Sequence, residues 1–154
     1  MSGARVRQKD NGANALLKRI AAAARKHGLK VGVLEDGPSR SDGDVTNLDI
    51  AAFAEFGTET AEPRPWLSGW YDSQEKGSAD QLKKIGEDLV RGGVQDVDTG
   101  LDRFGRLASG ELQQRVRSGV PPPNAPSTVA QKGSSTPLVE SGDFAASITH
   151  KLDR

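Results

Sequence analysis

Residues 29–34 read LKVGVL, and this short stretch decides the fold class of the chain. Apolar residues at positions 29, 31 and 33 alternate with Lys30 and Gly32, which is the period of a strand with one buried face. Gly28 separates the stretch from a helical pattern before it, and the run from Glu35 to Pro38 is typical of a turn. The sequence therefore predicts a half-buried strand here.

The C-terminal tail has the same alternation. Ile148, His150 and Leu152 alternate with Thr149 and Lys151, so residues 147–152 are predicted to form a short strand. We expect this strand to pair with the one near residues 29–34. Because the intervening segments have helical spacing, the predicted fold is α+β, a small antiparallel sheet packed by three or four helices, with long exposed loops.

Four helices, the second of them short, are predicted from the period of the apolar residues and from capping signals. The first runs up to Gly28 and is basic on one side, with Leu16, Leu17, Ile20, Ala21 and Ala24 on the other. The N-terminal signals are Asp10 or Asn11, Asn47, Pro65 as a first helical residue, and Asp96. The C-terminal signals are Gly28, Gly57 and Gly92-Gly93. Gly77 is a possible site for a kink in the third helix. The last helix is predicted to cover Val97 to Val116.

The segment around the second and third helices contains most of the large aromatic residues. We expect Phe56 to be buried where the second helix turns at Gly57, and Arg64, held between two prolines, to pair with a carboxylate such as Glu55. Trp66, Trp70 and Tyr71 form an aromatic cluster that is core, an interface anchor or both. Core is the favoured interpretation.

The 154 residues fit one domain, residues 1–154, with loops at about 36–47 and 119–137 that we expect to be mobile. Leu, Ile, Val and Phe make up about a fifth of the chain, so its core is thin and we expect neighbouring subunits to supply further burial. Four prolines between Gly119 and Ser135 favour an extended arm, mobile in the free subunit and ordered in an assembly.

Composition argues against several function classes. The 21 basic and 21 acidic residues cancel, which disfavours a protein that mainly neutralises phosphates. The absence of cysteine excludes a disulfide, a zinc–cysteine site and a thiol nucleophile. No stretch is long and apolar enough for a signal peptide or a membrane span, so we expect no membrane and synthesis in the cytoplasm.

The motifs of enzymes and metal proteins are also missing. A calcium loop starting at Asp42 would place Asn47 and Phe53 where Gly and Glu are required, and no phosphate-binding GxxxxGK occurs. His27 and His150 are interpreted as structural residues. We therefore expect no catalytic residue, no cofactor and no metal.

Short segments in a fixed order resemble a bacteriophage family. They are AEFGT at 54–58, PRPWL at 63–67, Ser127-Thr128 with Lys132-Gly133, PLVESG at 137–142, and Ser147-Ile148. Together they resemble the small neck and tail-completion proteins of tailed phages, described as virion morphogenesis or minor tail proteins of the lambdoid Z type. The residues that carry the resemblance, and could form an interface, are Glu55, Phe56, Gly57, Arg64, Pro65, Trp66, Thr128, Lys132, Pro137, Leu138, Ser141 and Gly142.

The resemblance implies a structural function without a reaction. The chain would be a virion subunit of the neck or tail, assembled in the host cytoplasm, that completes the tail and helps it join the head. Its implied partners are itself in a ring, the head-completion or stopper protein, the tail terminator and the tail tube, with nucleic acid only as the genome in the channel. The alternatives are a nucleic-acid-binding accessory protein and a small hydrolase.

Overall fold

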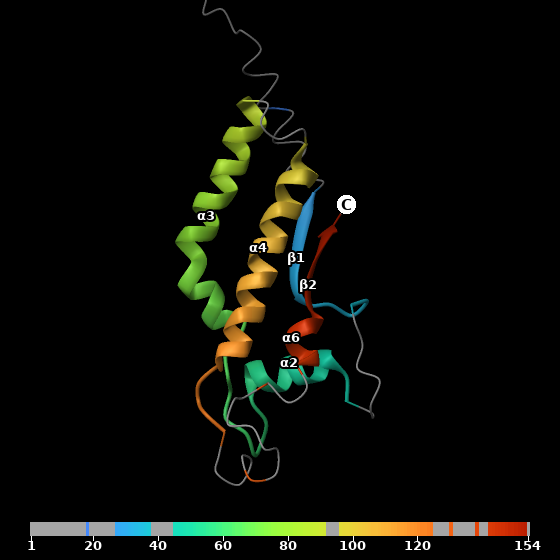
Figure 1. The fold of residues 1–154 in the computed structure, drawn as a ribbon, viewed down its shortest axis with the longest axis vertical. Coiled ribbons are helices and arrows are strands. Elements are labelled where there is room, and N and C mark those ends of the chain that lie inside the picture. Colours follow the sequence, from blue (N-terminus) through green and yellow to red (C-terminus); the bar gives the residue numbers. More distant parts are fainter. Residues whose placement is uncertain are drawn as a thin grey trace, which may run out of the picture.

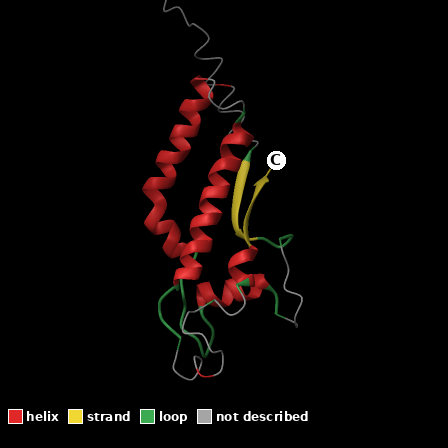
Figure 2. Cartoon of the chain, viewed as in Figure 1, coloured by secondary structure: helices red, strands yellow, loops and turns green. Residues whose placement is uncertain are grey.

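A computed structural model describes residues 27–37, 45–91, 96–124 and 142–153, together with Lys18, Ala130 and Leu138. It is an α+β fold, as predicted (Figures 1 and 2). The elements in chain order are β1 (Gly28–Val33), α2 (Asn47–Phe56), α3 (Ser68–Arg91), α4 (Val97–Ser118), α6 (Asp143–Ser147) and β2 (Ile148–Asp153).

The two strands pair in the antiparallel sense, which confirms the pairing predicted from their alternation. Val31 is opposite His150, and Val33 is opposite Ile148. Directly opposite residues in an antiparallel pair share one face of the sheet. The apolar positions of both strands therefore lie on the same face, and His150 lies among them.

Helix α4 lies between α3 and the sheet (Figure 1). Its start is as predicted, because the Asp96 carboxylate accepts a hydrogen bond from the Thr99 N–H at 2.7 Å and caps the helix. Gly105 lets the helix approach β2 closely, since a Cβ there would lie 2.4 Å from His150 Cδ2. The backbone of α4 thus packs directly on the sheet.

Two predicted helix starts are wrong by one to three residues. The N-cap of α2 is Thr46 rather than Asn47, because Thr46 and Asp49 form a reciprocal capping box. Helix α3 begins at Ser68 rather than Pro65, since the Tyr71 N–H donates to the Leu67 carbonyl whereas the Pro65 carbonyl accepts from the Arg115 side chain. Helix α3 continues through Gly77 as one helix, Ser68–Arg91.

The core lies at the end of the molecule where α2 and α6 meet the second half of α4 (Figure 1). Trp66 is 2% exposed, which confirms its prediction as a core residue. Its ring meets Phe144 edge to face, with centroids 5.4 Å apart. The buried apolar residues are Ala51, Ala54, Trp66, Trp70, Ala108, Leu112, Val116, Val120, Phe144, Ala145 and Ile148. Tyr71 is not one of them, because its side of α3 faces away from the core and it is 56% exposed.

Several predictions concern residues that the structure does not describe. The first predicted helix lies outside the described residues except for Lys18, which is helical and exposed. Most of the loop at 36–47 and, apart from Ala130, the segment at 125–137 also lie outside them. The described beginning of the second loop is attached to the core, because Val120 is 1% exposed.

Candidate functional site

The motif residues between 55 and 67 form one junction, which joins the end of α2 to the start of α3. Glu55 connects the two motif segments, because its Oε2 and Oε1 atoms accept the N–H groups of Leu67 at 2.9 Å and Ser68 at 3.1 Å. These donors lie at a helix N-terminus, where a carboxylate is also favoured by the helix dipole. Glu55 therefore sets the position of α3 relative to α2.

Arg64 has a different partner from the one predicted. Its Nε donates to the carbonyl of Pro122 at 2.9 Å and its Nη2 to that of Pro123 at 3.5 Å, whereas Glu55 is engaged by backbone N–H groups. The Arg64 backbone N–H donates to the carbonyl of Ala54. Arg64 thus attaches the segment after α4 to this junction, and the expected Glu55–Arg64 pair is wrong because better-placed backbone donors occupy the carboxylate.

Pro65 and Trp66 complete the junction from the core side. The Trp66 indole Nε1 donates to the carbonyl of Ala51 in α2 at 3.1 Å. The carbonyl of Pro65 accepts from Arg115 of α4 at 3.4 Å. Each of the two residues therefore connects the segment before α3 to a different helix, which holds the junction rigid.

Phe56 is 81% exposed, so the prediction that it is buried is wrong. The reason is geometric, because the inward positions of α2 are Asn47, Ala51 and Ala54 and Phe56 lies on the opposite side. The neighbouring Gly57 has φ 77°, and a Cβ there would lie 2.8 Å from the Ala61 carbonyl oxygen. A rigid backbone therefore presents an exposed aromatic ring.

The late motif is only partly described. Leu138 packs against the core, and Gly142, in a left-handed conformation, precedes the first turn of α6. Thr128, Lys132, Pro137 and Ser141 lie outside the described residues. The structure thus brings Glu55, Phe56, Gly57, Arg64, Pro65 and Trp66 together and does not test the other motif positions.

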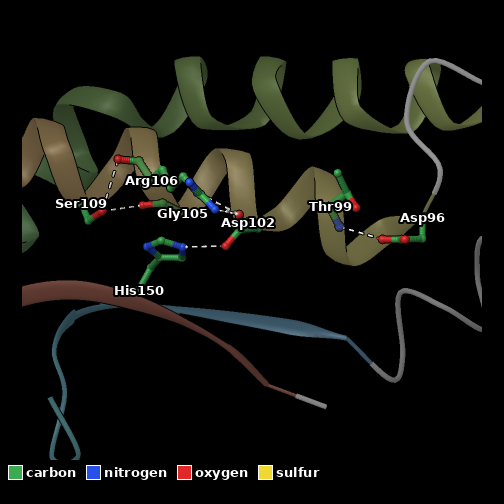
Figure 3. Close-up of polar contacts among 7 residues, drawn as sticks. All are labelled: Asp96, Thr99, Asp102, Gly105, Arg106, Ser109 and His150. Atoms are coloured by element: carbon green, nitrogen blue, oxygen red, sulfur yellow. Dashed lines mark hydrogen bonds and ion pairs between the residues drawn. The ribbon is translucent and has the colours of Figure 1, made fainter.

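Both histidines pair with carboxylates of α4. His27 Nδ1 lies 2.5 Å from Asp98 Oδ1, and His150 Nε2 lies 3.0 Å from Asp102 Oδ1 (Figure 3). Arg106 Nη2 also approaches Asp102, at 2.7 Å. These hydrogen bonds, from His150 first and Arg106 second, hold the pKa of Asp102 below its ordinary value. The sequence alone does not indicate these partners of the two histidines.

The arrangement does not resemble a hydrolytic site. The hydroxyl of Ser109, one turn from Arg106, donates to the carbonyls of Gly105 and Arg106 in its own helix (Figure 3). His150 Nε2 is engaged by Asp102. The hydroxyl drawn nearest to this pair is therefore not aligned with a base that could activate it.

Within the described part of the chain, no three His, Asp or Glu side chains gather closely enough to hold a metal ion. None of the helices in the described ranges is both long and apolar enough to cross a bilayer.

Comparisons with models of protein families, with curated proteins and with solved structures find no match to this chain. The resemblance to tail-completion proteins therefore depends on the motif segments alone. The exposure of Phe56 is the feature of the junction that differs most from the prediction. The sequence contains one indication of this exposure. At helical spacing, Phe53 and Phe56 lie on a different side of the helix from Ala51 and Ala54.

Proposed function

We propose that the chain is a structural virion protein of a tailed phage, a subunit of the neck or tail that completes the tail and helps it join the head. It acts without catalysing a reaction. Its proposed partners are further copies of itself in a ring, and the adjoining head-completion or stopper, tail-terminator and tail-tube proteins. It is assembled in the host cytoplasm and ends in the virion.

One observation carries this proposal beyond the motifs themselves. The two motif segments meet in a single junction, where Glu55 contacts Leu67 and Ser68 while Phe56 is left 81% exposed. Exposed aromatic rings on a rigid backbone are typical anchors of protein interfaces, because they bury much area at little cost in conformational entropy. A structural subunit needs such a surface, whereas an enzyme needs a pocket with positioned reactive groups.

The proposal is tested on phage particles and on the genes beside this one. We expect the flanking genes to encode portal, head-completion, tail-terminator and tail-tube proteins, and mass spectrometry to find the chain in purified particles. A nonsense mutation in the gene should give separate heads and tails in electron micrographs. Flanking metabolic genes, or particles that lack the chain, would refute the proposal. Retention on DNA at about 0.15 M salt would instead favour the nucleic-acid alternative.

A further inference from the structure

The outward side of α2 is apolar, although the helix packs on a core. Leu48, Ala52, Phe53 and Phe56 are exposed, whereas Asn47, Ala51 and Ala54 are buried. At 100° per residue the exposed set lies on the side opposite the buried set, where Asp49 is also located, between Phe56 and Phe53. We call these four exposed residues the outer face of α2.

The segment that contains this face is acidic. Residues 45–63 contain four acidic side chains and no basic one. Glu59 and Glu62 are exposed in the loop that follows Phe56. The loop is held by hydrogen bonds from Thr58 N–H to the Ala61 carbonyl and from Ala61 N–H to the Thr58 hydroxyl. The complementary partner is an apolar segment with basic flanks.

The chain contains such a segment at its other end. Residues 1–30 carry eight Lys or Arg and one Asp, whereas residues 31–63 carry eight Asp or Glu and one Arg, so the zero net charge of the whole chain results from two oppositely charged regions. Residues 11–26 combine apolar Leu16, Leu17 and Ile20 with basic residues on the other side of the predicted helix. Lys18 is helical and exposed.

We propose that residues 11–26 of one copy bind the outer face of α2 of a second copy. Their apolar side chains would cover Leu48, Phe53 and Phe56, and their basic side chains would meet Glu59 and Glu62. The contact is head to tail, because it joins two different surfaces, and such contacts close into rings when the rotation between copies allows it.

Geometry favours a second copy over the same chain. Residue 27 lies beside the start of α4, because His27 contacts Asp98, whereas α2 shares its core with Leu112 and Val116 near the end of that helix. From Asp98 to Val116 the helix rises roughly 27 Å, and a 16-residue helix spans roughly 24 Å. The outer face lies on the far side of α2, a further ~10 Å away. A helix attached at residue 27 would not reach it.

The test uses the full chain and two charge-reversed variants in sedimentation velocity. E59K/E62K alters the acidic surface, and K18E/R25E alters the basic one. We expect the wild type to associate at about 0.05 M salt and each variant alone to associate at least about tenfold more weakly. An equimolar mixture of the two variants should associate again, because each then offers the other a complementary surface.

A control separates this contact from general charge effects. E75K/E87K makes the same change of charge at exposed positions of α3 and should associate like the wild type. F56S should weaken association while thermal melting stays unchanged. A wild type that is monomeric at about 100 µM in low salt would overturn the inference, and so would variants that associate normally or a mixture that stays monomeric.

The inference rests on the proposed function in one respect, that the chain works as an assembled subunit. The two can fail separately, because sedimentation uses purified protein alone. A chain found in virions but monomeric in solution would overturn this contact only. A chain that associates as described but is missing from particles would refute the virion function only.

Discussion

The two halves of α4 hold the molecule together by different means. The second half buries Ala108, Leu112 and Val116 in the core. In the first half the buried residues are the glycines Gly100 and Gly105, and the polar contacts join Asp98 and Asp102 to the two histidines. Figure 3 shows the second of these pairs lying between α4 and β2.

The two halves contribute differently to the fold. The second half of α4 chiefly stabilises it, and the first half chiefly fixes the position of α4 along the sheet. Burial of apolar area is non-directional, so the second half of α4 chiefly stabilises the fold, with a directional contact to the sheet where Gln113 Nε2 donates to the Ile148 carbonyl at 2.9 Å. Hydrogen bonds between a carboxylate and a ring nitrogen are directional. Because Asp98 and Asp102 are one helical turn apart and each meets its own histidine, a shift of α4 along the sheet would break both pairs. The following predictions test this division, from the largest expected effect to the smallest.

Trp66→Ala should have the largest effect on stability. The side chain is 2% exposed, packs on Phe144 and donates to the Ala51 carbonyl, so its removal leaves a cavity and removes this hydrogen bond. We expect the free energy of unfolding to fall by roughly 3 to 5 kcal/mol, measured by urea denaturation. An unchanged free energy of unfolding in the variant would show that the apolar core around the second half of α4 does not dominate stability.

Gly105→Ala should have the next largest effect, at the boundary between the two halves. The new Cβ would lie 2.4 Å from His150 Cδ2 and 2.9 Å from Leu29 Cδ1, so the helix must move away from the sheet. We expect a loss of about 1 to 3 kcal/mol in the free energy of unfolding. Gly110→Ala is the matched control on the same helix, because nothing lies within 4 Å of its Cβ. It should stabilise by about 0.5 to 1 kcal/mol, and equal effects would refute the close approach.

Asp102→Asn should have a smaller effect that depends on pH. Since His150 and Arg106 lower the pKa of Asp102 in the folded state, its carboxylate stabilises the fold above the ordinary pKa, and this contribution is lost as the pH falls through the lowered one. The variant should therefore be less stable than the wild type at about pH 6, and the difference should shrink below about pH 4. Urea denaturation at several pH values measures this.

The matched control for this prediction is Asp80→Asn, at an exposed position of α3. It tests whether removing any surface carboxylate from a helix gives the same result. If the stability difference between Asp102→Asn and the wild type does not change between neutral and acidic pH, the Asp102–His150 pair does not hold the first half of α4 on the sheet.

Phe56→Ala should change stability least, within about 0.5 kcal/mol. Phe56 is in α2, its side chain is 81% exposed, and it takes part in neither the apolar nor the polar contacts of α4. Phe144→Ala is the matched control, because Phe144 is 5% exposed and packs on Trp66, and it should lower the melting temperature strongly. A large loss of stability in Phe56→Ala would place its ring in the fold rather than on an interaction surface.

The candidate site was predictable in part. The sequence places Glu55 and Gly57 at the end of a helix and puts Arg64 on a stiff segment between two prolines. It does not indicate which carbonyl or N–H group each side chain reaches, and the predicted partner of Arg64 is wrong because its actual acceptor, the Pro122 carbonyl, is 58 residues away. Hydrogen bonds over such separations depend on how the helices pack.

The local pattern of this chain determined the α+β class, both strands and the capped start of α4, because strand alternation and the Asp96 cap depend only on neighbouring residues. Only the tertiary structure decided which side of α2 is covered, that Phe56 is exposed, and which carboxylates meet His27 and His150. The physical reason is that periodicity defines the sides of a helix, whereas burial depends on the space that α4 and α6 leave. In α2 that space admits alanine and not phenylalanine.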